Sequence, residues 1–198
     1  RELLDEVGRL SRERGLLVHS HASENRDEIA LVRQRTGLGN IEYFAATGLA
    51  APHVCLAHCV WVDDREQALL AEGDVKVLHC PGSNLKLGSG LAPVAEMRRR
   101  GISVSLGADG AACNNHLDMF QERRRAATLQ AVRCGPGALT ARDTLAMATL
   151  GLGVIVSIVL GNEDRLTGGP DGMAVPPLVL AGRTLQGEPL WYGIVAVA

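Results

Sequence analysis

Three histidines and one aspartate each follow a short apolar run of the sequence: His21, His58, His79 and Asp109. A glutamate, Glu24, lies three residues beyond the first of them. Imidazole and carboxylate groups are ligands that Zn²⁺ and similar ions take in proteins, and a bound ion lowers the pKa of its water to about 7. A carboxylate aimed at the same point can then move protons. These residue types predict metal-assisted hydrolysis.

Each of these residues also has a purely structural interpretation. Ser23, Glu24 and Asn25 are good first-turn residues of a helix, His58 fits a hydrogen-bonded core histidine, and an Asp-Gly pair such as that at Asp109 is typical of a turn. Four consecutive strand ends that carry His, His, His and Asp are nevertheless hard to obtain from a scaffold alone. The combination therefore favours the functional interpretation.

Two further features surround these residues. The segment from His79 to Asn84 predicts a polar loop, because its proline, glycine and asparagine favour turns. Cys59 and Cys80 each follow a histidine, so as neighbours on a strand their side chains should point to the opposite face. We interpret both cysteines as small buried filler.

The elements that must position the site alternate along the chain. Apolar spacing predicts helices over residues 2–14, 25–36, 41–47, 63–72, 92–100, 117–133 and 140–149, and buried strands over 16–18, 53–57, 75–78 and 102–106. Such alternation predicts an α/β fold with a parallel sheet that is covered on both faces. In such folds catalytic groups lie at the carboxyl ends of the strands, where the histidines and Asp109 fall.

The last part of the chain has a different pattern. Residues 151–198 are rich in glycine, proline and valine without a clear helical period, and their candidate strands are 154–160, 178–181 and 194–197. We predict a domain over residues 1–150 and an irregular tail or small β element over 151–198.

Composition excludes several classes of protein. The chain of 198 residues has a net charge of −2 and 3% aromatic residues, which argues against a nucleic-acid surface. Its apolar run over 150–160 is shorter than the ~20 residues of a membrane span. Its five cysteines form no CxxC pair, which favours a reduced, cytoplasmic and soluble protein. The sequence contains neither a GxGxxG nor a GxxxxGK[ST] motif, which argues against binding of a nucleotide phosphate.

Four longer strings resemble the amidohydrolase superfamily, in its aminohydrolase and chlorohydrolase branch. They are VHSHASENRDE (18–28), LAHCVW (56–61), VLHCPGSNLKLGSGLAP (77–93) and LGADGAACNNHLDMF (106–120). HASENRDE is similar to guanine deaminases. The strings from GNIEYF to GADGAACNNHLDMF resemble deaminases that act on S-adenosylhomocysteine, methylthioadenosine or 5′-deoxyadenosine, and the triazine hydrolases share much of the same frame.

The resemblance implies roles for six residues. His21 matches the metal ligand of barrel strand five, and Asp109 matches the strand-eight aspartate that is both ligand and base. Glu24 matches the proton shuttle and His58 the strand-six histidine that orients the hydrolytic water. His79 and the loop that holds Asn84 match the substrate-facing end of strand seven, so the expected substrate contacts are Glu24, His79 and Asn84.

The resemblance also implies a fold and a cofactor. The expected fold is a (β/α) barrel of TIM type that binds one divalent metal, zinc first and iron second. The HxH motif of strand one, which supplies two further ligands, has no counterpart, because His19-x-His21 lies on the strand that matches number five. A full barrel needs ~250 residues. We therefore expect the second half of a barrel, strands five to eight.

Three functions remain open at this point. The first is metal-dependent hydrolytic deamination of a purine-type or related aminated heterocycle, in which an activated water attacks the amino-bearing carbon and ammonia leaves. The second is a triazine-type chlorohydrolase or amidohydrolase with the same metal half and a different pocket. The third is a non-catalytic half barrel that associates through its exposed edges, so a homo-oligomer is a candidate partner beside the small heterocyclic substrate.

Overall fold

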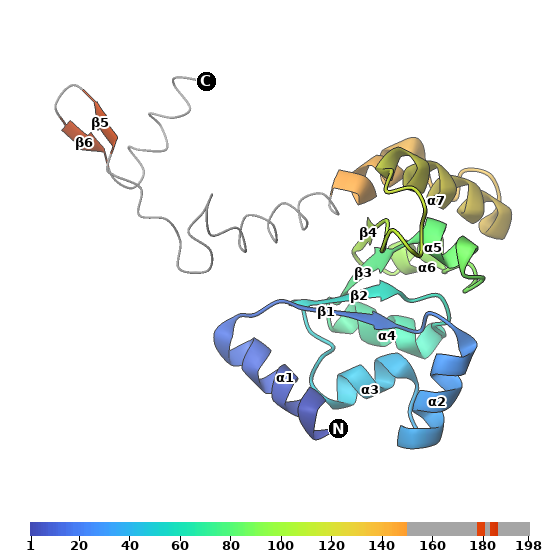
Figure 1. The fold of residues 1–198 in the computed structure, drawn as a ribbon, viewed down its shortest axis with the longest axis horizontal. Helices are drawn as coiled ribbons and strands as arrows, with labels where there is room; N and C mark the ends of the chain where they lie inside the picture. Colours follow the sequence, from blue (N-terminus) through green and yellow to red (C-terminus); the bar gives the residue numbers. More distant parts are fainter. Residues whose placement is uncertain (150–177, 181–182, 186–198) are drawn as a thin grey trace. The chain divides into compact units, whose positions relative to one another are not determined.

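A computed structural model describes residues 1–149, 178–180 and 183–185. The chain divides into two compact units, Arg1–Gly153 and Val154–Ala198. Strands and helices alternate in the first unit (Figure 1): α1 (Glu2–Arg14), β1 (Val18–Ala22), α2 (Arg26–Thr36), α3 (Asn40–Ala46), β2 (Val54–His58), α4 (Asp64–Glu72), β3 (Lys76–His79), α5 (Pro81–Lys86), α6 (Val94–Arg99), β4 (Val104–Leu106), α7 (Met119–Cys134) and a helical stretch at 141–149. Among these helices none combines the length and apolar character that a bilayer span needs.

The four strands of the first unit form one parallel sheet in the order β1-β2-β3-β4. The register pairs Ala22 with His58 and His79 with Leu106, so the carboxyl ends of the strands meet at one edge. The predicted α/β class and parallel sheet are confirmed. Because neighbouring strands lie about 4.8 Å apart, residues that follow these ends can share one site.

Local sequence signals set where the helices begin and end. The side chains of Asn25, Asp63 and Asp118 accept backbone N–H groups at the starts of α2, α4 and α7. Gly15 and Gly37 end α1 and α2 with φ of 64° and 76°, a conformation that costs glycine little. The capping interpretation of the segment before α2 is thus correct for Asn25.

The hydrophobic core lies between the central strands and their helices. Leu56, Val77 and Leu106 from the sheet pack with Leu70 and Met97 from the helices, and all five are fully buried. Helices α6 and α7 pack beside β4, whereas α3 packs against α2 and α4 (Figure 1). This apolar core packs against the sheet whose carboxyl ends meet at one edge.

Strand β1 departs from the prediction that both faces of every strand are covered. It pairs only with β2 among the described strands, and its residues alternate between exposed and partly buried, with His19 and His21 exposed. Leu16 and Leu17, predicted to belong to a buried strand, precede β1 and are 50% and 73% exposed. An edge strand lacks the second neighbour that would cover them.

The structure also corrects the prediction for the segment after β3. The sequence predicts a polar loop from His79 to Asn84, but Pro81–Lys86 form the short helix α5. Proline is accommodated at the first helical position, where no N–H partner is needed, and Asn84 N donates to Cys80 O at 3.0 Å. The helix gives Ser83 and Asn84 a fixed orientation that a loop would not.

The second unit contains one described feature. Strand β5 (Leu178–Leu180) pairs antiparallel with β6 (Arg183–Leu185), and β5 falls within the strand predicted over 178–181. The strands predicted over 154–160 and 194–197 lie outside the described residues.

Candidate active site

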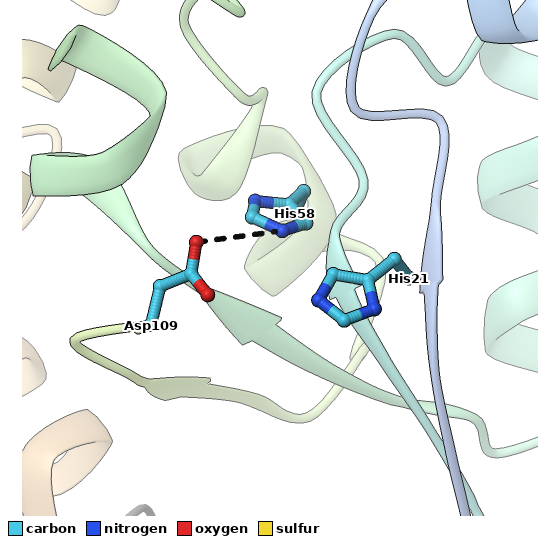
Figure 2. Close-up of side chains that lie close together, drawn as sticks. All are labelled: His21, His58 and Asp109. Atoms are coloured by element: carbon cyan, nitrogen blue, oxygen red, sulfur yellow. Dashed lines mark ion pairs between the residues drawn. The ribbon is translucent and has the colours of Figure 1, made fainter. Parts of the chain in front are cut away.

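Three side chains from different strands converge at the carboxyl edge of the sheet. His21 lies on β1, His58 ends β2 and Asp109 follows β4, and one ligand atom from each lies within 4.8 Å of the others (Figure 2). The rings of His21 and His58 are stacked with their centroids 5.2 Å apart, and His58 Nε2 lies 4.0 Å from Asp109 Oδ2. Of the four predicted strand-end residues, these three form the cluster, whereas His79 is buried beside it.

Backbone strain is concentrated at this edge. Five non-glycine residues of the described chain have positive φ, and four of them lie at or just after the ends of β1, β2 and β4: Ser23 (53°), His58 (71°), Cys59 (45°) and Asp109 (62°). Each such conformation costs of the order of 1–3 kcal/mol and persists where the surroundings enforce it. These residues mark the turns that the chain makes at the carboxyl ends of β1 and β2 and after β4.

His58 is held in one orientation by a buried amide. Its ring is 1% exposed, and Nδ1 lies 2.8 Å from Oδ1 of Asn84. Because that oxygen can only accept, Nδ1 carries the proton and donates. The other nitrogen, Nε2, then faces Glu24 Oε2 at 3.9 Å and Asp109 Oδ2 at 4.0 Å.

Both carboxylate oxygens of Asp109 accept hydrogen bonds. Ser83 Oγ donates to Oδ2 at 2.5 Å, and the backbone N–H of Gly110 donates to Oδ1 at 2.7 Å. Partial burial would raise the pKa of Asp109, but these two hydrogen bonds and the neighbouring imidazoles of His58 and His21 hold it below its usual value. Asp109 is therefore ionised at neutral pH.

Glu24 is fixed through both its main chain and its side chain. Its Oε1 accepts from Ser89 Oγ at 3.0 Å, and the carbonyl of Ser89 accepts from Trp61 Nε1 at 2.7 Å. The carboxylate of Glu28 accepts the backbone N–H groups of Ser23 and Glu24 at 3.1 and 2.8 Å. Glu24 thus faces the histidine cluster with little freedom to move.

His79 and Asn84, predicted to contact substrate, are both buried and 2% exposed. Burial, followed by the proximity of His58, lowers the pKa of His79 to about 3, so its ring is neutral. Neither ring nitrogen of His79 has a hydrogen-bond partner among the described residues. The contact of His79 and Asn84 with substrate stays a prediction.

Four residues support the site. Ser83 belongs to the loop with Asn84 that is expected at the substrate-facing end, whereas Ser89, Trp61 and Glu28 were not singled out from the sequence. Their partners lie between 4 and 65 positions away in the chain, so no local spacing reveals them. Only the strings quoted above, which contain all four, mark the segments as unusual. The prediction that Cys59 and Cys80 are buried is confirmed, and burial raises the pKa of both thiols.

These observations define an α/β chain with an imidazole and carboxylate cluster at the carboxyl edge of a parallel sheet. Residues 1–151 match the model of the amidohydrolase family, and the chain belongs to that family. It is 49% identical over 150 residues to the 5′-deoxyadenosine deaminase of Methanothermobacter thermautotrophicus, an alignment that covers 75% of this chain and 35% of that protein.

Solved structures give the same result. An adenosine deaminase from Xanthomonas campestris with bound zinc superposes with a TM-score of 0.71 and 36% identity, over 73% of this chain and 33% of that one. The guanine deaminase of C. acetobutylicum with bound guanine superposes with a TM-score of 0.70 and 32% identity, over 74% and 37%. The chain thus spans about a third of the length of the proteins it matches.

Proposed function

We propose that this chain supplies the second half of the active site of a hydrolytic deaminase that acts on an adenosine-type or related aminated heterocycle. The observation that carries the proposal is the convergence of His21, His58 and Asp109 within 4.8 Å. The similarity to 5′-deoxyadenosine deaminase, at 49% identity, supports the substrate class.

The donor set fits one divalent ion. Two imidazoles and a carboxylate are ligand types that zinc accepts, and iron takes the same types. The hydrogen bond from His58 Nδ1 to Asn84 fixes the tautomer in which Nε2 has a free lone pair, as a ligating or water-orienting histidine requires. We assign His21 and Asp109 as metal ligands, and a bound ion would supply Lewis-acid activation of water.

The chain's own groups can perform the proton transfers. Asp109, ionised and held by Ser83, accepts a proton from the attacking water. His58 Nε2 orients that water, because it lies about equally far from both carboxylates. The water loses two protons in all, and Glu24 Oε2 relays one of them to the ring nitrogen and the other to the amino group, which departs as ammonia.

The architecture completes the proposal. We propose that β1–β4 correspond to strands five to eight of a TIM-type barrel, that residues 1–150 form this half and that residues 151–198 form a separate tail. Two observations support it: among the described strands β1 pairs only with β2, and His19 and His21 are exposed, whereas in a closed barrel another strand would lie along that edge.

Ammonia release from 5′-deoxyadenosine by the zinc-loaded protein tests the proposal. We expect turnover that Asp109→Asn and Glu24→Gln each reduce by about 100-fold or more, whereas Asp64→Asn, at a carboxylate 87% exposed, serves as the control. Turnover of a chlorinated or alkylamino triazine without any aminated purine would instead favour the triazine hydrolase alternative. If Asp109→Asn and Glu24→Gln both kept the turnover of wild type, the roles assigned to these residues would be refuted.

A further inference from the structure

A second carboxylate, Glu122, lies inside the protein behind the proposed site. It belongs to α7, is 0% exposed and is not part of the cluster. Its Oε2 accepts the backbone N–H of Gly82 at 2.7 Å. Its Oε1 accepts from Asn114 Nδ2 at 3.0 Å and from Arg125 Nη1 at 2.5 Å.

Two of these partners, Gly82 and Asn114, lie on the two segments that hold the site together, whereas Arg125 lies on α7 itself. Gly82 precedes Ser83 and Asn84, which bond Asp109 and His58 respectively. Asn114 also donates from Nδ2 to the carbonyl of Ala108, the residue before Asp109, at 2.9 Å. One buried carboxylate therefore connects the start of α5 to the segment after β4.

The packing around Gly82 shows that this connection is tight. A Cβ placed on Gly82 would lie 2.6 Å from Arg125 Nη1 and 2.7 Å from Asn114 Nδ2, and it would also overlap the Glu122 carboxylate. Only glycine allows the backbone to approach so closely. The distance between α5 and the segment after β4 is consequently set at Glu122.

We infer that Glu122 is a positioning residue that fixes Asp109 and the Ser83–Asn84 pair relative to one another. The Ser83–Asp109 hydrogen bond spans these two segments, and a shift of either segment would lengthen it. Lys86 at the end of α5 also joins them, because its Nζ donates to Ala112 O and Asn115 Oδ1 at 2.6 Å each, but these contacts are exposed at the surface. The inference rests on the proposed function for the role of Asp109, but the connection itself is independent of any metal or substrate.

Amide hydrogen exchange of the metal-free full chain tests the connection directly. The variant Glu122→Gln keeps the shape of the side chain, but its NH₂ group must face hydrogen-bond donors, either the N–H of Gly82 or the side chains of Asn114 and Arg125. We expect amide exchange at residues 82–84 and 108–110 to accelerate by about 10- to 100-fold relative to wild type. This is the change that corresponds to the loss of a hydrogen bond to a charged acceptor. The variant Asn114→Ala, which keeps the Gly82 contact, should accelerate 108–110 alone.

A matched control lies on the same helix. Gln130 is also 0% exposed, accepts from Ala95 N at 3.0 Å and donates to Ala92 O at 2.8 Å. Gln130→Leu should accelerate exchange near 92–95 and leave the other two segments unchanged. If Glu122→Gln accelerates only the same segments as Gln130→Leu, or none, the inference is overturned.

The absorption spectrum of the Co²⁺-loaded protein provides a readout that a general loss of stability would not move. We expect Glu122→Gln to shift the visible bands of bound Co²⁺ and Gln130→Leu to leave them unchanged; identical spectra for wild type and Glu122→Gln would contradict the inference. Failure of the wild type to bind Co²⁺ or to release ammonia would count against the proposed function, whereas hydrogen exchange would still decide the role of Glu122.

Discussion

Replacement of Asn84 by alanine separates a positioning role from substrate contact. The hydrogen bond between Asn84 Oδ1 and His58 Nδ1 is 2.8 Å long, and both residues are almost fully buried. Asn84→Ala leaves the His58 N–H without a partner, which costs about 1–3 kcal/mol of folding free energy. A ligand atom of His58 lies within 4.8 Å of one from each proposed metal ligand, His21 and Asp109, so a shift of its ring would disturb the metal site. The loss of an outer hydrogen-bond partner in a metal site typically lowers metal affinity or activity by about 10- to 100-fold.

Two measurements check this prediction. Zinc competition against a chromophoric chelator measures the dissociation constant, and urea denaturation of the metal-free chain measures the free energy of unfolding. Asn84→Asp keeps an acceptor for Nδ1 and should restore most of the affinity. Asn115→Ala, at an exposed asparagine that accepts from Lys86, is the control.

The reasoning would be refuted if Asn84→Ala kept a zinc affinity within twofold of wild type and a free energy of unfolding within about 0.5 kcal/mol of wild type. A variant with those values and a raised KM would show instead that Asn84 contacts substrate through Nδ2, which has no protein partner among the described residues.

Four further predictions address other parts of the site. Burial lowers the pKa of His79 to about 3 from 6.5, so between these pH values the unfolded chain binds more protons than the folded chain. The free energy of unfolding should therefore fall by up to about 1.4 kcal/mol for each pH unit below pH 6.5. His79→Gln should flatten this dependence in urea titrations. Gly90→Ala, at φ 126° with its new Cβ 2.9 Å from Trp61, should lose about 1–3 kcal/mol of stability, measured by the same titrations. Glu24→Gln should retain zinc, measured by atomic absorption, while turnover falls. Chelation with phenanthroline should abolish ammonia release and added zinc should restore it, whereas chelation without effect would exclude a metal requirement.

The sequence predicts the helices and strands of the sheet well because each carries strong local signals. The caps at Asn25 and Asp63 and the glycines that end α1 and α2 lie at or within a residue of the predicted boundaries. Helix α5 was missed because proline and glycine favour turns in isolation, while tertiary contacts such as that between Gly82 and Glu122 stabilise the helix.

The candidate site likewise has a part that the sequence predicts and a part that it does not. Strand-end positions follow from the alternation of elements, so the convergence of His21, His58 and Asp109 could be predicted. The positive φ values and the partners of these residues depend on contacts across the chain. Ser89 approaches Glu24 from 65 positions away, and no spacing rule anticipates such a contact.

Anomalous X-ray diffraction at the zinc edge, from crystals of the zinc-loaded protein, tests the central claim most directly. We predict one zinc peak at the carboxyl edge of the sheet, with a nitrogen of His21 about 2.0–2.1 Å away and an oxygen of Asp109 about 2.0–2.2 Å away. A zinc peak bound elsewhere, or none at this edge at equimolar zinc, would contradict the account.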